Sequence, residues 1–140
     1  MYLGIDCGTQ GTKALVLDAD SGQVLGAGSA SHSLQSAANG RREQQPGQWL
    51  EAFEQATRQA LAAAGIRGEQ ILGIGVSGQQ HGLVLLDEQG AVLRPAKLWC
   101  DTESTPENQR LLEHLGGAAG SLQRLGVAIA PGYTVKKLLW

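Results

Sequence analysis

A short run near the N-terminus combines the groups needed to hold a phosphate. Residues 4–13 read Gly-Ile-Asp-Cys-Gly-Thr-Gln-Gly-Thr-Lys and lie between two apolar stretches. Gly8 and Gly11 permit positive φ and leave no Cβ between the backbone and an approaching ligand. Successive N–H groups in such a turn form a concave anion site, and the hydroxyls of Thr9 and Thr12 add donors.

Asp6 and Lys13 place opposite charges at the two ends of this turn. Mg²⁺ is usually held by one or two carboxylates together with phosphate oxygens and water, so Asp6 beside an anion site favours a cation there. An ordinary hairpin with solvated ends explains the same residues equally well. The run is not a Walker A loop, because Lys13 precedes a predicted strand and not a helix.

A second polar turn, Gly78-Gln79-Gln80-His81-Gly82, follows an apolar stretch. Gln80 and His81 both donate and accept hydrogen bonds, which suits sugar hydroxyls. A single histidine in such a place is also a common structural hydrogen bonder. Further along, Trp99 and Asp101 read, from the residues alone, as a core aromatic and an acid in the turn before a helix.

Composition describes a soluble globular chain. The 140 residues are 42% hydrophobic and 17% charged with a net charge of −2, which predicts one domain and gives no sign of a nucleic-acid or membrane partner. No apolar run approaches the roughly 20 residues of a membrane span, and no secretion signal is seen. We expect Cys7 and Cys100 to be reduced thiols in a cytoplasmic protein, with a disulfide as the alternative.

Periodicity predicts the elements that position these groups. Two strands flank the first turn and a third follows at 23–28, forming an antiparallel meander. Helical spacing begins at Pro46 and ends at Gly65. Further strands are expected at 71–77, buried on both faces, and at 83–86, whereas 29–45 reads as a loop. Because a strand is expected after Gly73-Ile74-Gly75-Val76-Ser77-Gly78, this G-x-G-x-x-G match is not a dinucleotide fingerprint.

The last third of the chain is predicted to be helical. Ser104-Thr105-Pro106-Glu107 reads as a capping box before a helix that Gly116-Gly117 ends, and a weaker helix surrounds Leu122 and Leu125. A further helix starts after Pro131-Gly132-Tyr133-Thr134 and has no C-cap, which suggests a truncated domain. Truncation predicts an exposed apolar face that favours a homodimer or aggregation, made of Val135, Leu138, Leu139 and Trp140.

Five segments of the chain, in register from end to end, resemble the FGGY carbohydrate kinases of the sugar kinase–Hsp70–actin superfamily. Asp6–Lys13 resembles their first phosphate motif, and Gly-Gln-x-His-Gly at 78–82 resembles their sugar-binding turn. The other three similar segments are Glu43–Trp49, Trp99–Asp101 and Pro131–Trp140. The resemblance implies an incomplete, RNase H-like α/β domain over residues 1–140, with a mixed sheet and flanking helices.

The resemblance also implies roles for single residues. ATP phosphates are expected over Gly8, Thr9, Gln10, Gly11, Thr12 and Lys13, with Asp6 on the Mg²⁺ side as a metal ligand. Substrate contacts are expected from Gln80, His81, Trp99 and Asp101, although the family commonly has Met where Gln80 stands. The general base, an Asp, is expected beyond residue 140, so residues 1–140 alone are expected to be inactive.

Among FGGY kinases, these segments most resemble the branch that converts D-xylulose to D-xylulose 5-phosphate with ATP. The partners implied are therefore a small sugar and the remainder of the kinase chain. Two alternatives stay open. One is a kinase of another FGGY sugar, such as ribulose, gluconate or glycerol, and the other is a non-catalytic sugar sensor or actin-like module with the same fold.

Overall fold

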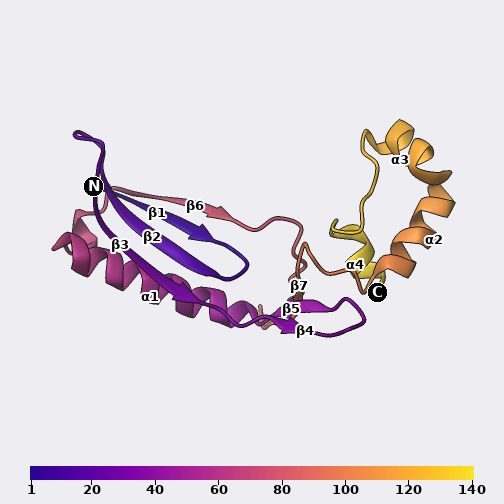
Figure 1. Cartoon of the computed structure of the whole chain (residues 1–140), viewed down its shortest axis with the longest axis horizontal. Helices are drawn as coiled ribbons and strands as arrows, with labels where there is room; N and C mark the ends of the chain where they lie inside the picture. The colour runs from indigo at the N-terminus through magenta and orange to yellow at the C-terminus, as the bar shows by residue number, and fades with distance from the viewer. The chain divides into compact units, whose positions relative to one another are not determined.

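The computed structural model describes residues 1–140, which divide into two compact units (Figure 1). We call Met1–Leu34 together with Gln45–Gln79 the hairpin unit. Gln35–Gln44 together with Gln80–Trp140 form the lysine unit. Each unit has a β-sheet and α-helical structure of its own.

The sheet of the hairpin unit has the strand order β3-β2-β1-β6. These strands are β1 (Tyr2–Cys7), β2 (Gly11–Asp18), β3 (Gln23–Ser31) and β6 (Gly73–Gly78). β1 pairs antiparallel with β2, and β2 with β3, whereas β1 and β6 are parallel. The predicted meander and the predicted mixed sheet are therefore both confirmed.

Helix α1 (Pro46–Ala64) covers one face of this sheet (Figure 1). Pro46 is its first residue and Gly65, at φ 67°, ends it in the left-handed conformation, as the sequence predicts. Because successive strand side chains point to opposite faces, every second residue of β1 and β2 faces the helix. The resulting apolar core consists of Leu3, Ile5, Ala14, Val16, Ala56 and Ala60.

Two strand predictions are corrected. β6 was expected to be buried on both faces, but it is the edge strand of the sheet, and Ile74 and Val76 are exposed. A 3₁₀ turn, η1 (Gly68–Gln70), precedes it. Residues 83–86 form no strand and make only isolated bridges, from Leu83 to Lys97 and from Leu86 to Val92. A run of apolar residues is not enough for a strand unless a partner lies alongside it.

The lysine unit contains a small sheet of order β4-β5-β7. Its strands are β4 (Gln35–Ser36), β5 (Arg42–Gln44) and β7 (Ala96–Lys97), all antiparallel. The expectation of a plain loop over 29–45 is therefore wrong, because β3 extends to Ser31 and two short strands follow. The strands are too short to show the period-2 pattern that identifies a strand in a sequence.

Three helices complete the lysine unit: α2 (Thr105–Leu115), α3 (Gly117–Leu125) and α4 (Val135–Leu139). The predicted capping box is absent, since Ser104 makes no side-chain cap bond. Ser104 has ψ 23° and not the extended backbone that aims an N-cap oxygen at the helix N–H groups. The apolar face predicted at the end of the chain is exposed. Its side chains are between 44% and 65% accessible and belong to Val135, Leu138, Leu139 and Trp140.

Candidate functional site

The turn between β1 and β2 is closed by a hydrogen bond from Gly8 N to Gly11 O at 3.0 Å. Neither glycine uses the positive φ that the sequence permits. Gly11 is required for a different reason, because a Cβ there would lie only 2.6 Å from Ala30 O of β3. The turn is therefore shaped by close backbone packing against β3.

Asp6 and Lys13 are directly opposite each other in the β1–β2 pair. Both side chains are exposed on the sheet face that α1 does not cover, and they line a hollow of about 880 Å³ together with Leu15, Val76 and Ser77. Asp6 makes no side-chain hydrogen bond or ion pair within the chain. The hairpin thus presents a carboxylate without a partner in the chain and, on the residue directly opposite, an ammonium.

Thr12 lies on the opposite face, fully buried, with its hydroxyl 2.9 Å from His32 Nε2. Its side chain therefore stabilises the hairpin from the buried face of the sheet and is not accessible to a ligand. Burial lowers the pKa of His32, although a hydrogen bond from its ring to the Thr9 backbone acts in the opposite direction. Sequence reasoning missed His32, since a histidine at the end of a strand gives no periodic signal.

The remaining turn residues are also held in place. Thr9 Oγ1 donates to Gln79 Oε1 at 3.3 Å, and Gln10 O accepts from His32 N at 3.1 Å. Gln79 belongs to the second polar turn of the sequence but lies in the hairpin unit. His32 and Gln79 therefore both bond to this turn from outside it.

Gln80 and His81 have exposed side chains in the lysine unit. His81 is the one non-glycine residue of the chain with positive φ, at 59°. Its imidazole is stacked on the ring of Tyr133, with centroids 4.7 Å apart and planes inclined by 22°. The predicted sugar-binding turn therefore carries an ordered, exposed histidine ring.

Trp99 and Asp101 are close in sequence but differ in accessibility. Trp99 is 50% exposed, so it is not the core aromatic that the residues alone suggest. Asp101 is completely buried. Its Oδ2 accepts from Arg42 N at 2.7 Å and its Oδ1 from Glu103 N at 3.2 Å. Both carboxylate oxygens of Asp101 are thus engaged within the protein.

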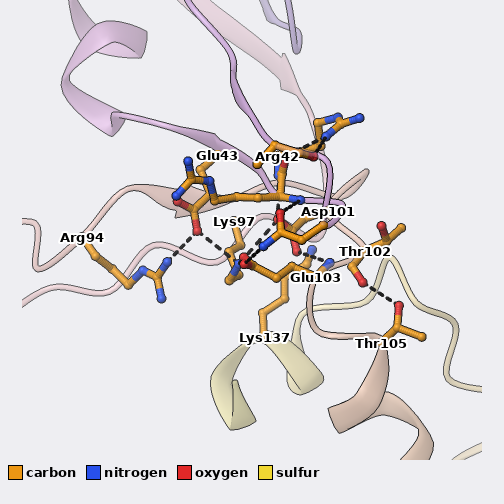
Figure 2. Close-up of polar contacts among 12 residues, drawn as sticks. Arg42, Glu43, Arg94, Lys97, Asp101, Thr102, Glu103, Thr105 and Lys137 are labelled. Atoms are coloured by element: carbon orange, nitrogen blue, oxygen red, sulfur yellow. Dashed lines mark hydrogen bonds and ion pairs between the residues drawn. The ribbon is translucent and has the colours of Figure 1, made fainter.

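Figure 2 shows a charged cluster that sequence reasoning missed, with the Lys97 ammonium at its centre. Lys97 Nζ lies 3.1 Å from Glu43, 3.5 Å from Asp101 and 2.5 Å from Glu103. Arg94 pairs with Glu43 at 2.5 Å, and the ring of Trp140 covers Lys97 Nζ at 3.7 Å. The hydrogen bond from Lys97 is the main cause that lowers the pKa of Glu103.

The three carboxylates of this cluster converge as metal ligands do, with ligand oxygens within 4.8 Å of one another. The Lys97 ammonium already lies among them and provides the compensating charge, so the cluster is an internal salt-bridge network. The predicted site residues thus fall into two sets. Asp6 and Gly8–Lys13 belong to the hairpin unit, and Gln80, His81, Trp99 and Asp101 belong to the lysine unit.

Three further observations bear on the class of protein. Cys7 and Cys100 are both free thiols in this structure. No helix combines the length and the apolar character that crossing a membrane requires. No helix begins directly at the turn after Gly78, so the G-x-G-x-x-G match is not a dinucleotide fingerprint, as expected.

Comparison with known proteins identifies the family. The chain is 52% identical to the xylulose kinase of Haemophilus influenzae over its whole length, which is 29% of that protein. Solved structures of kinases from Brucella ovis, titled a xyloylose kinase, and Rhodospirillum rubrum, titled xylulose kinase, match 99% of the chain. Their TM-scores are 0.88 and 0.90, at 38% and 29% identity, and the match spans 28% of each. The chain thus spans less than a third of these relatives.

The family model described as the FGGY family of carbohydrate kinases, N-terminal domain, matches residues 1–140. The mixed sheet of the hairpin unit and the likeness to solved sugar kinases agree with this match. The chain belongs to the FGGY family of carbohydrate kinases, and its residues match the N-terminal domain of that family.

Proposed function

We propose that the natural full-length protein containing residues 1–140 transfers the γ-phosphoryl group of ATP to D-xylulose, forming D-xylulose 5-phosphate and ADP. The observation that carries this proposal is the unengaged Asp6 carboxylate opposite Lys13 beside the Gly8–Gly11 turn. The relatives named xylulose kinase support the choice of sugar. The whole enzyme is required, because the chain spans under a third of those relatives.

In this proposal the Gly8–Gly11 turn and Lys13 hold the phosphates of ATP. Enzymatic phosphoryl transfer depends chiefly on positioning and charge stabilisation, so an ordered turn with an ammonium beside it meets the main requirement. Thr9 and Gln10 contribute to the same turn, and Thr12 contributes indirectly, through the His32 contact that fixes β2. The proton of the sugar hydroxyl passes to an Asp beyond residue 140.

Asp6 fits the requirements of a Mg²⁺ ligand. It is an exposed carboxylate without an internal partner, whereas the Asp101 oxygens already accept hydrogen bonds inside the protein. Carboxylate oxygens are the protein ligands that Mg²⁺ prefers, usually one or two with waters and phosphate oxygens. When bound, Mg²⁺ neutralises charge on the phosphates. Asp6 would hold this ion at the hairpin.

The sugar is assigned to the lysine unit. Gln80 and His81 offer exposed donors and acceptors for hydroxyl groups, and Trp99 offers an exposed aromatic face for the carbon backbone of the sugar. Asp101, which is buried, fixes the segment that carries Trp99 through its bonds to Arg42 and Glu103. The two reduced thiols fit a cytoplasmic location.

The experiment uses the full-length protein and follows ADP release with D-xylulose, L-ribulose, gluconate and glycerol as acceptors. We expect kcat/KM to be highest for D-xylulose. A preference for another sugar would support the proposed kinase activity but would contradict D-xylulose as the substrate. Absence of turnover with every sugar, in a folded protein, would refute the kinase proposal and favour a non-catalytic sugar sensor or assembly module.

A further inference from the structure

The sugar-facing turn has a backbone conformation that needs support. His81 is at φ 59°, a region that glycine adopts freely and other residues rarely do. The adjacent Gly82 does not take the positive φ. A non-glycine residue in this conformation persists where surrounding contacts determine it, and such residues cluster at functional sites. The contacts that hold His81 in this conformation therefore identify the residues that order the turn.

One of these contacts comes from α4, near the other end of the sequence. Lys137 Nζ donates to His81 O at 2.6 Å and to Gly132 O at 2.8 Å. The Lys137 side chain is buried, and Figure 2 shows it rising from its helix. A single ammonium thus joins the His81 turn to the segment that carries Tyr133, whose ring stacks on the His81 imidazole.

The same segment also lies against Trp99. A Cβ on Gly132 would be 2.8 Å from Trp99 O, so glycine is required for the backbones to approach this closely. Lys137 therefore lies at the junction of three pieces of chain, carrying His81, Tyr133 and Trp99. His81 and Trp99 are two of the residues to which we assign sugar contacts.

Stability alone does not account for Lys137. Both of its acceptors are neutral carbonyls, and a buried ammonium without a carboxylate partner is costly. Burial, with a further contribution from the neighbouring Lys136, lowers the pKa of Lys137 to about 8, while Asp101 and Cys100 act in the opposite direction. An apolar side chain of similar length would avoid this cost, which indicates that the two hydrogen bonds serve another purpose.

We propose that Lys137 is a positioning residue for sugar binding, which fixes the His81 turn and the Gly132–Tyr133 segment against each other. The inference rests on the proposed function, because it takes the sugar to be bound at Gln80, His81 and Trp99. Lys137 touches backbone oxygens and not the sugar, so its loss acts on the order of the turn. Phosphate binding by the hairpin unit does not depend on it.

The test compares Lys137→Met with Lys136→Met in the full-length protein. Both lysines are buried and adjacent, but Lys136 Nζ has no hydrogen-bond partner, so it controls for the loss of a buried ammonium. We expect Lys137→Met to raise the KM for D-xylulose by roughly 10- to 100-fold, the range that corresponds to a hydrogen bond from a charged group. The KM for ATP should not change, and Lys136→Met should leave both KM values unchanged.

A second readout does not depend on catalysis. Hydrogen exchange of the backbone amides at residues 79–83 should be faster in Lys137→Met than in wild type, and unchanged in Lys136→Met. Equal KM values and equal exchange in Lys137→Met and wild type would overturn the proposal. So would a KM for ATP that rises together with the KM for the sugar.

The two proposals can fail separately. If the wild-type protein phosphorylates no sugar, the proposed function is refuted, and hydrogen exchange at 79–83 still decides whether Lys137 orders the turn. If Lys137→Met does not fold, Lys137→Gln replaces it, since its shorter stem keeps a polar end but withdraws it from the carbonyls. Wild-type exchange and KM in that variant would overturn the proposal.

Discussion

The two units of the chain bury different kinds of side chain. The core of the hairpin unit is apolar and is formed by alternate strand residues and one stripe of a helix, with Val16, Ala56 and Ala60 fully buried. In the lysine unit the buried side chains include Lys97 and its carboxylate partners Glu43 and Asp101, beside the apolar Ala96 and Leu98. One unit is therefore stabilised by removing apolar surface from water, and the other depends on the pairing of buried charges.

This difference has consequences for both stability and function. Apolar burial is non-directional, so it tolerates small shifts of the side chains involved. A buried ion pair is directional, and removing one member leaves the charge of the other buried without a partner or water. The hairpin unit can thus expose Asp6 and Lys13 on a sheet held from its other face. The lysine unit fixes the turn that carries His81 through individual polar contacts.

The largest effect is expected at Lys97. Lys97→Met would leave the carboxylates of Glu43, Asp101 and Glu103 together without their central ammonium. We expect a loss of about 3–5 kcal/mol in the free energy of unfolding of the lysine unit. Urea unfolding monitored by tryptophan fluorescence measures this loss. Two of the three tryptophans, Trp99 and Trp140, report on the lysine unit, and Trp49 reports on the hairpin unit.

The matched control is Arg58→Met on α1. Arg58 also pairs with a carboxylate, Glu54, but the two side chains are 75% and 62% exposed. An exposed pair of this kind contributes little, so the change should be within about 0.5 kcal/mol. Equal losses from Arg58→Met and Lys97→Met would show that the charged core of the lysine unit is not the source of its stability.

A smaller loss is expected where α1 meets β3. A Cβ on Gly28 would collide with the Ala56 carbonyl oxygen, so Gly28→Ala must force the helix and strand apart. We expect a cost of about 1–3 kcal/mol, as for other overpacked cores. The same denaturation experiment on Gly75→Ala is the control, since a Cβ there meets nothing within 4 Å. Similar losses in both variants would contradict the close packing of α1 on β3.

The lysine unit should gain stability in mild alkali. The pKa of Lys137 is lowered from its ordinary 10.5 to about 8, so between these values the unfolded chain carries a proton that the folded chain lacks. The free energy of unfolding therefore rises with pH across this window, and Lys137 contributes no pH dependence below it. Denaturation at several pH values should show this rise in wild type and a weaker one in Lys137→Met. Equal slopes would argue against a lowered pKa.

The smallest expected effect is a loss of stability of the hairpin unit at acidic pH. Burial lowers the pKa of His32 from 6.5, so as the pH falls below that value the unfolded chain takes up a proton first. Stability should therefore fall with acidification in this range. In His32→Asn, which keeps a polar side chain beside Thr12, the fall should be shallower. An identical acid dependence in the two proteins would exclude this contribution from His32.

The same contrast explains what the sequence predicts. The hairpin, β3 and α1 follow from apolar periodicity and from Pro46 and Gly65, because an apolar core imposes the period of each element on the sequence. The Lys97 cluster could not be predicted. Lysine and glutamate usually mark a solvated surface, and Glu43 reaches Lys97 only through the β5–β7 pair.

The candidate site divides in the same way. Asp6 and Lys13 were predictable as neighbours, because a short turn between two strands brings its ends into register. The support of Thr12 by His32 and of His81 by Lys137 was not predictable, because each contact joins residues remote in sequence. Positive φ at His81 was also not predictable. Glycine adopts this conformation most readily, yet the neighbouring Gly82 does not adopt it here.

The most direct test of the central claim is Asp6→Asn in the full-length protein, measured as kcat for D-xylulose phosphorylation over a range of Mg²⁺ concentrations. Asp20→Asn, an exposed acid in the turn after β2, is the control. If Asp6 holds Mg²⁺ at the phosphate hairpin, kcat should fall by about 100-fold or more and saturation should need more Mg²⁺, while Asp20→Asn behaves as wild type. Wild-type turnover and wild-type Mg²⁺ dependence in Asp6→Asn would contradict the account.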